Sequence, residues 1–101
     1  MQIYKAPLRD MRFVLHEMLD VEQLSKLPGY EEATADTIDA IIEEGARFCE
    51  DKLLPLNRIG DEQGCTYENG VVRTPPGFKQ AYDDFVGGGW QAISADPKYG
   101  G

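Results

Sequence analysis

The stretch from Thr34 to Leu56 constrains the fold most, because its apolar residues recur at spacings of three and four. That spacing places them on one stripe of an α-helix. The stripe consists of Ile38, Ile41, Ile42, Ala46, Cys49, Leu53 and Leu56. Acidic residues, Asp39 and Glu43 among them, fill the opposite face, which we expect to be solvated. Since such a stripe is unstable alone in water, other elements of the chain must cover it.

Both ends of this helix carry sequence signals. Thr34 or Asp36 is the expected N-cap, because a side-chain oxygen there accepts from an otherwise unpaired backbone N–H. Pro55 has no N–H to continue the helical hydrogen bonds, so we expect the helix to end or kink near Leu54. Residues 57–65 are then expected to form a polar loop.

Two further helices and a short helical turn are expected. Residues 1–7 are predicted to be extended, and residues 8–19 repeat apolar side chains at helical spacing. Residues 21–27 suggest one or two turns that stop at Pro28-Gly29. A helix after Pro75-Pro76-Gly77 is expected to end at Gly87 in the left-handed conformation. Its apolar stripe consists of Phe78, Ala81, Tyr82, Phe85 and Val86.

One segment predicts β-structure. Short apolar runs at residues 65–67 and 71–73 flank Asn69-Gly70, the dipeptide that type I′ hairpin turns prefer because both central residues need φ > 0. The expected fold class is therefore all-α, mainly helical, with one small β-hairpin. A chain of 101 residues is one domain or part of one.

Charge and composition exclude several partners. The net charge of −8 argues against nonspecific binding to nucleic acid or anionic lipid, because both need Lys and Arg opposite phosphates. No apolar run reaches the roughly 18 residues of a membrane span. The N-terminus lacks the apolar centre of a signal peptide, so we expect a cytoplasmic protein without a membrane span.

No residue pattern indicates a catalytic or metal site. His16 is the only histidine, no nucleophile motif surrounds it, and we interpret it as a surface or half-buried helical residue. Cys49 and Cys65 form no CxxC or Cys/His quartet for zinc and are expected to be free thiols. The acids at residues 61–62 lack the spacing of a calcium loop. A hydrolase or metal enzyme that uses His16 and a carboxylate has no support from spacing.

The glycine-rich segment from Gly87 to Ala92 matches the G-x-G-x-x-A dinucleotide pattern. That motif must follow a strand and open a helix, whereas here it follows a predicted helix. We therefore expect a tight helix-ending turn that lets Trp90 fold back onto the core.

Three segments together resemble the acyl-CoA dehydrogenase family. Residues 4–19, YKAPLRDMRFVLHEML, are similar to the N-terminal extension of a branch that includes 3-methylmercaptopropionyl-CoA dehydrogenases and similar bacterial enzymes. Residues 53–65, LLPLNRIGDEQGC, resemble the segment after that family's first long helix, and residues 88–101, GGWQAISADPKYGG, resemble its GW…P-x-x-Y-G-G loop.

The resemblance implies a homo-oligomeric FAD enzyme of fatty-acid metabolism with helical N- and C-terminal domains around a middle β domain. A glutamate base takes the α-proton of an acyl-CoA thioester, FAD takes hydride from the β-carbon, and an electron acceptor reoxidises the flavin. Residues 1–33 would be the N-terminal extension with the first helix. Residues 34–101 would be the incomplete start of the helical domain within a larger α+β enzyme.

Family chains are several times longer than this one, and the resemblance places their FAD-binding segments and catalytic glutamate beyond residue 101. No catalytic, cofactor-binding or metal-binding residue is therefore assigned here. The glutamates on expected solvated faces are not candidates for the base; these are Glu17, Glu43, Glu44 and Glu50. We expect an inert N-terminal fragment that needs the missing domains. The alternative is a stand-alone acidic helical interaction module.

Overall fold

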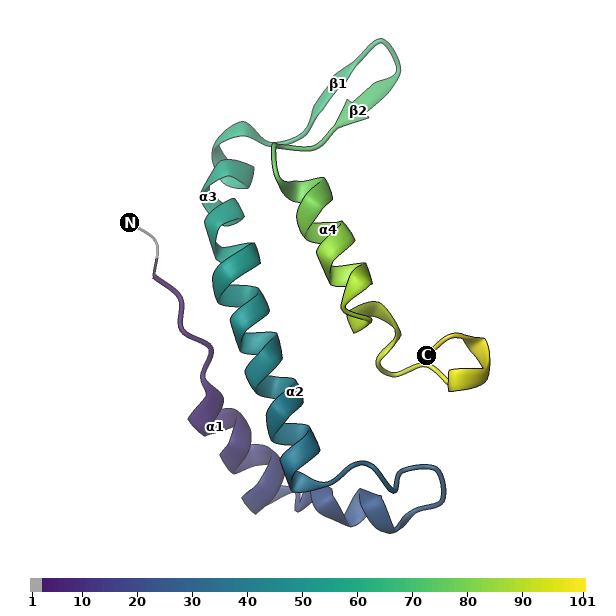
Figure 1. The fold of residues 1–101 in the computed structure, drawn as a ribbon. Coiled ribbons are helices and arrows are strands. Elements are labelled where there is room, and N and C mark those ends of the chain that lie inside the picture. The colour runs from purple at the N-terminus through teal and green to yellow at the C-terminus, as the bar shows by residue number, and fades with distance from the viewer. Residues whose placement is uncertain (1–2) are drawn as a thin grey trace. The chain divides into compact units, whose positions relative to one another are not determined.

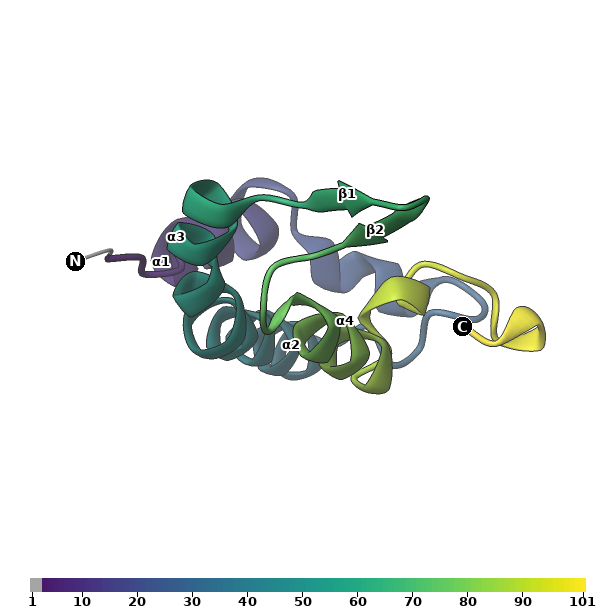
Figure 2. The same ribbon diagram turned by 90° about the horizontal axis from the view of Figure 1, so that it is seen from above.

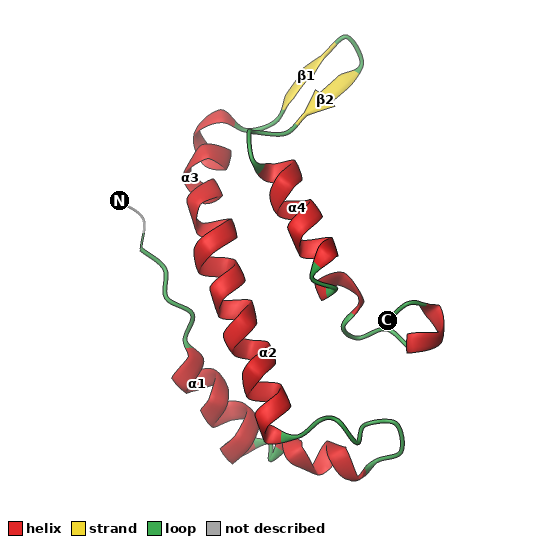
Figure 3. Cartoon of the chain, in the orientation of Figure 1, coloured by secondary structure: helices red, strands yellow, loops and turns green. Residues whose placement is uncertain are grey.

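The computed structural model describes residues 3–101 and is mainly helical, with one two-stranded sheet (Figures 1 and 3). The α-helices and strands are α1 (Leu8–Arg12), α2 (Ala35–Phe48), α3 (Leu54–Gln63), β1 (Thr66–Glu68), β2 (Val71–Arg73) and α4 (Phe78–Gly87). Two π-helical segments (Phe13–Met18 and Cys49–Leu53) and three 3₁₀ segments (Val21–Lys26, Trp90–Ala92 and Pro97–Tyr99) complete the secondary structure. The predicted fold class, helical with a small hairpin, is confirmed.

The chain divides into two compact units, Met1–Leu54 and Pro55–Gly101, and each is described by itself. In the first unit, α1 and the π-helical segment after it lie beside α2 (Figure 1). The N-cap of α2 is Thr34, whose side-chain oxygen accepts from the Thr37 N–H at 3.3 Å. Asp36 lies in the first turn of α2, and Arg47 in its last turn, as the helix dipole favours.

The expected extended segment at residues 1–7 falls partly on Met1 and Gln2, which lie outside the described residues. Residues 3–7 have no helix or strand, in agreement with the prediction. Ile3 is largely exposed. The helical turn expected after Val21 is a 3₁₀ helix that ends at Lys26, and Gly29 follows at φ +90°.

Of the two outcomes expected near Leu54, an end of the helix or a kink, the structure does not show the end. Helical structure runs on through α3 to Gln63, so most of the expected loop at residues 57–65 is helix. The last turn before the proline is π-helical, and the Leu54 N–H donates to the Cys49 carbonyl, five residues back. A π-helical turn shifts the backbone hydrogen bonds from the residue four back to the residue five back, next to the proline that lacks an N–H donor. Helical structure can therefore continue past Pro55.

The second unit contains the hairpin. β1 and β2 pair antiparallel with Tyr67 opposite Val72 and Glu68 opposite Val71 (Figure 2). Asn69 and Gly70 have φ of +51° and +78°, as a type I′ turn requires. The predicted hairpin is confirmed, and every residue in its strands is exposed.

In the same unit, α3 approaches α4 through a glycine. A Cβ built on Gly60 would lie 2.6 Å from Cζ of Phe78, so the ring occupies the space that a side chain would need. Gly77, at φ +90°, precedes α4, and a Cβ there would lie 2.7 Å from Cδ2 of Leu56. Ala81 is the buried residue of α4.

The end of α4 differs from the prediction. Gly87 is the last helical residue, and the left-handed conformation falls on Gly89, at φ +78°. Gly88 remains right-handed because its N–H still bonds to the Asp84 carbonyl. Trp90 then folds back over Gly88, where a Cβ would lie 2.9 Å from the indole nitrogen. Within residues 3–101, no helix has the length and apolar character of a membrane span.

Candidate functional site

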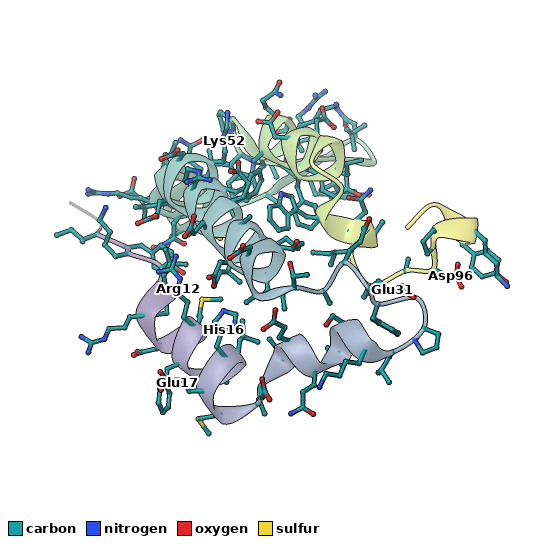
Figure 4. All side chains as sticks on the ribbon, turned by 60° about the horizontal axis from the view of Figure 1, so that its bottom comes forward. Arg12, His16, Glu17, Glu31, Lys52 and Asp96 are labelled. Carbon is teal, nitrogen blue, oxygen red and sulfur yellow. The ribbon has the colours of Figure 1, made fainter. Side chains whose placement is uncertain are left out.

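A cluster of charged side chains joins α1 to α2, and it is the densest set of interhelical polar contacts in the first unit. His16 Nε2 lies 2.7 Å from Oδ1 of Asp39. Arg12 donates through Nη2 to Glu43, and its Nε lies 3.6 Å from Asp39. Figure 4 shows Arg12 and His16 on the side of α1 that faces α2, with Glu17 on the other side.

The cluster follows from helical spacing on both partners. Arg12 and His16 are four residues apart, as are Asp39 and Glu43, so each pair projects from one helix face. The face expected to be solvated is thus partly covered at Asp39 and Glu43, because the N-terminal segment packs against both carboxylates. Matching pairs of cations and acids at four-residue spacing were the sequence signal that could have shown this contact.

The contacts of the cluster join the N-terminal helical segment to α2. A His–Asp pair acts in catalysis when the imidazole also reaches a nucleophile or a substrate proton. No hydroxyl or thiol hydrogen-bonds to His16 anywhere in residues 3–101. The guanidinium of Arg12 lies against both acids, so their carboxylate oxygens already have ion-pair partners. His16 is half-buried, as its sequence position predicted.

The other residues that were considered lie apart from this cluster. Cys49 is half-buried and Cys65 exposed, and both are free thiols. Glu17 and Glu44 are exposed, and Glu44 pairs with Arg47 one turn along α2. Glu50 pairs with Lys5 at 3.5 Å. Among the described side chains, no three His, Cys, Asp or Glu residues converge on a possible metal position.

Contacts with neighbouring residues shift the pKa values of Arg47, Lys79 and Glu31. The hydrogen bond and charge of Glu44 raise the pKa of Arg47, and those of Asp83 raise the pKa of Lys79. Hydrogen bonds from its own backbone N–H and from that of Gly29 lower the pKa of Glu31. All three groups are exposed and belong to turns or single helix faces, so they do not mark a catalytic pocket.

The glycine-rich segment does not fit a flavin pyrophosphate. A phosphate cradle offers backbone N–H groups at the start of a helix. Here the Gly88 and Gly89 N–H groups already donate to the carbonyls of Asp84 and Val86, because the segment ends α4. The Trp90 indole also covers the backbone at Gly88.

Comparison with known proteins identifies the relatives. The chain is 42% identical over 98 residues to a 3-methylmercaptopropionyl-CoA dehydrogenase of Ruegeria pomeroyi. It is 34% identical over 84 residues, and 31% identical over 90 residues, to two butyryl-CoA dehydrogenases of Syntrophomonas wolfei. The chain is homologous to acyl-CoA dehydrogenases. No family model matches it.

The homology covers nearly all of this acyl-CoA dehydrogenase homologue but little of its relatives. The three alignments include 97%, 79% and 85% of this chain, whereas they include 17%, 14% and 15% of the relatives. The resemblance drawn from residues 4–19, 53–65 and 88–101 is thus confirmed at the level of the family.

Proposed function

We propose that this chain is the N-terminal helical part of a FAD-dependent acyl-CoA dehydrogenase that introduces an α,β double bond into an acyl-CoA thioester. The observation that carries the proposal is the 42% identity that spans 97% of this chain and 17% of the relative. On this proposal, residues 1–33 form the N-terminal extension, and residues 34–101 begin the helical domain.

The catalytic base and the FAD site are supplied by polypeptide outside residues 1–101. Two features support this assignment. The half-buried carboxylates of Asp39 and Glu43 are paired with Arg12, and the N–H groups of Gly88 and Gly89 already donate to backbone carbonyls. The 101-residue chain alone is therefore proposed to be inactive. The parent enzyme would be a cytoplasmic homo-oligomer that uses an acyl-CoA substrate, FAD and an electron acceptor.

Exposed apolar side chains support the need for further domains. Buried hydrophobic residues among those described are Ala46 and Ala81, whereas large apolar side chains remain open on several elements. Examples are Met18 and Leu19 at 64% exposure and Tyr82 at 65%. A self-sufficient domain covers most such side chains with its own elements, so surfaces of this kind fit a part that packs against more protein.

The test compares the 101-residue chain with the polypeptide encoded when the reading frame is followed past codon 101. FAD binding is measured by fluorescence polarisation, and activity by acyl-CoA-dependent reduction of an electron-accepting dye. We expect no saturable FAD binding by the short chain and both properties in the long one. Micromolar FAD binding by the short chain would contradict the proposal.

The second candidate, a stand-alone acidic interaction module, is favoured by the net charge of −8 alone. A stop codon directly after codon 101, together with a compact monomer that does not bind the dye ANS, would support it. The acyl-CoA dehydrogenase proposal instead expects ANS binding. It also expects self-association as salt rises from about 0.01 to 1 M, because salt screens the repulsion between acidic chains.

A further inference from the structure

The contacts of the N-terminal segment with α2 and with the π-helical segment after it, Cys49–Leu53, follow a regular antiparallel order. Lys5 pairs with Glu50, Arg12 with Glu43, and His16 with Asp39. Lys5 and Arg12 are seven residues apart, as are Glu43 and Glu50; Arg12 and His16 are four apart, as are Asp39 and Glu43. Residue numbers rise along one segment by the same intervals by which they fall along the other, so the three pairs belong to one antiparallel alignment. We call each pair a rung. The N-terminal segment supplies Lys5, Arg12 and the His16 imidazole, and the three carboxylates come from α2 and the π-helical segment after it.

The charge pattern favours this alignment over those one turn away. Sliding the N-terminal segment along α2 by four residues would bring Arg12 opposite Arg47, and by three residues opposite Ala46. Sliding it the other way by three residues would bring Lys5 opposite Arg47, and by four residues opposite Ala46. Every such shift loses at least two of the three rungs. The rungs therefore specify register, a role for which paired charges are well suited.

Water and ions reach every rung. The Lys5 side chain is 87% exposed, and those of Arg12 and Glu43 are 38% and 43% exposed. The apolar side chains of the segment are only partly covered: Leu8 and Leu15 are half-buried, whereas Met11, Phe13, Val14 and Met18 are exposed. A contact that depends on solvent-accessible charges weakens as salt screens them.

We propose that residues 3–18 form a detachable strap. The Lys5–Glu50, Arg12–Glu43 and His16–Asp39 rungs hold the strap in one antiparallel register on α2 and the π-helical segment after it. The strap is released as a unit when salt screens the charges of the rungs or when substitutions reverse them. Release uncovers Asp39 and Glu43 while α2, which is capped by Thr34, stays helical. The strap is a conformational element of the chain that does not depend on the proposed enzymatic function.

Hydrogen exchange of backbone amides tests the strap directly. Between about 0.01 and 1 M NaCl the Debye length falls from ~30 to ~3 Å. We expect exchange protection in Leu8–Met18 to fall about tenfold, because salt weakens the solvent-accessible Lys5–Glu50 and Arg12–Glu43 ion pairs. Protection in α4 should change less than about twofold, because its Lys79–Asp83 pair lies within one helix. Equal losses in α1 and α4 would overturn the proposal.

Charge reversal separates the rungs from general salt effects. At low salt, Arg12→Glu should lower protection in Leu8–Met18 about as much as 1 M salt does, while circular dichroism shows that α2 remains folded. Arg12→Glu with Glu43→Arg should restore protection, since it rebuilds the central rung with the charges exchanged. Arg58→Glu is the matched control, because Arg58 pairs with Glu62 within α3, outside the unit that contains the strap. Failure of the double variant to restore protection, or an equal effect of Arg58→Glu, would overturn the strap.

Discussion

The two compact units join their helices by different means. In Met1–Leu54, the N-terminal segment meets α2 through half-exposed charged side chains such as Arg12 and Glu43. In Pro55–Gly101, α3 meets α4 where Gly60 leaves space for the ring of Phe78. The charged contact specifies which residues face one another and yields to salt. The glycine contact depends on shape and yields only to a change in volume.

This difference shows that one short chain uses two kinds of specificity. The charged rungs remain paired when water reaches them and when side chains move slightly. They can therefore specify the register of the N-terminal segment relative to α2. Where Gly60 meets the ring of Phe78, an added side-chain atom would require a neighbouring group to move. A contact of this kind favours a fixed packing of the two helices. The comparison can be tested by changes that affect one kind of contact and leave the other intact.

The largest expected effect comes from Ile42→Asp. Ile42 lies half-buried on the apolar side of α2, and a carboxylate there would lack a partner. We expect the free energy of unfolding to fall by about 2–4 kcal/mol in thermal or urea melts. The result would show that the first unit, despite its charged contact, still depends on apolar burial.

The matched control is Glu44→Ala, two residues along the same helix. Glu44 is exposed and pairs only with Arg47 on its own helix, so its loss should change stability by less than about 0.5 kcal/mol. Equal melting midpoints for the two variants would mean that the assigned apolar side of α2 is wrong.

An intermediate effect is expected for Gly60→Ala in the second unit. Alanine normally stabilises a helix interior by about 1 kcal/mol relative to glycine. Here the new methyl group would lie 2.6 Å from Cζ of Phe78, so we expect a loss of about 1–3 kcal/mol instead. Urea melts of Gly60→Ala with and without Phe78→Leu measure the coupling between the two positions.

Gly87→Ala provides the control for this prediction. Gly87 is also helical, but a Cβ there would meet nothing within 4 Å, so the ordinary helix preference should make this variant more stable. If both glycine variants gained stability, the close approach of α3 and α4 would not constrain the second unit.

The smallest expected effect concerns a charge in the first unit outside the strap. Hydrogen bonds from its own N–H and that of Gly29 lower the pKa of Glu31 below 4.5, the ordinary value for Glu. Because the folded-state pKa is depressed, the stabilisation is present above the unfolded pKa and is lost as pH falls through the folded pKa. NMR titration of the Glu31 carboxylate should show the lowered pKa.

Glu31→Gln should remove this part of the acid dependence, whereas Glu32→Gln, one residue on, should leave it unchanged. An unshifted Glu31 titration would contradict the stabilisation of its carboxylate by these backbone N–H groups. Either result sharpens the contrast between local and long-range charges.

Local signals in the sequence predicted much of the fold. The stripe beginning at Ile38, the cap at Thr34 and the Asn69-Gly70 turn each depend on residues within a few positions of one another. Such features follow from backbone geometry and propensity, which a single sequence carries. The loop predicted after Pro55 was wrong, because a π-helical turn precedes the proline and helical structure continues to Gln63.

Partner choice was harder to predict than local structure. Helix periodicity placed Asp39 and Glu43 together correctly, but it could not show that Arg12 and His16 would cover them. The close approach of Gly60 to Phe78 was missed for the same reason, since it joins two elements separated by a hairpin. The place of the glycine-rich segment after a helix was predicted from the sequence, because that place is a local property.

The equal spacing of the rungs has a consequence for how related sequences can differ in length. Inserting one residue between Arg12 and His16, or between Asp39 and Glu43, would turn everything beyond it by about 100° around the helix and separate the later rung from its partner. The connection from Asp20 to Ala33, most of whose residues are exposed, carries no rung and needs only to span the distance between the helices. Length variation among homologues should therefore collect in that connection, while the helical intervals on either side keep their residue counts.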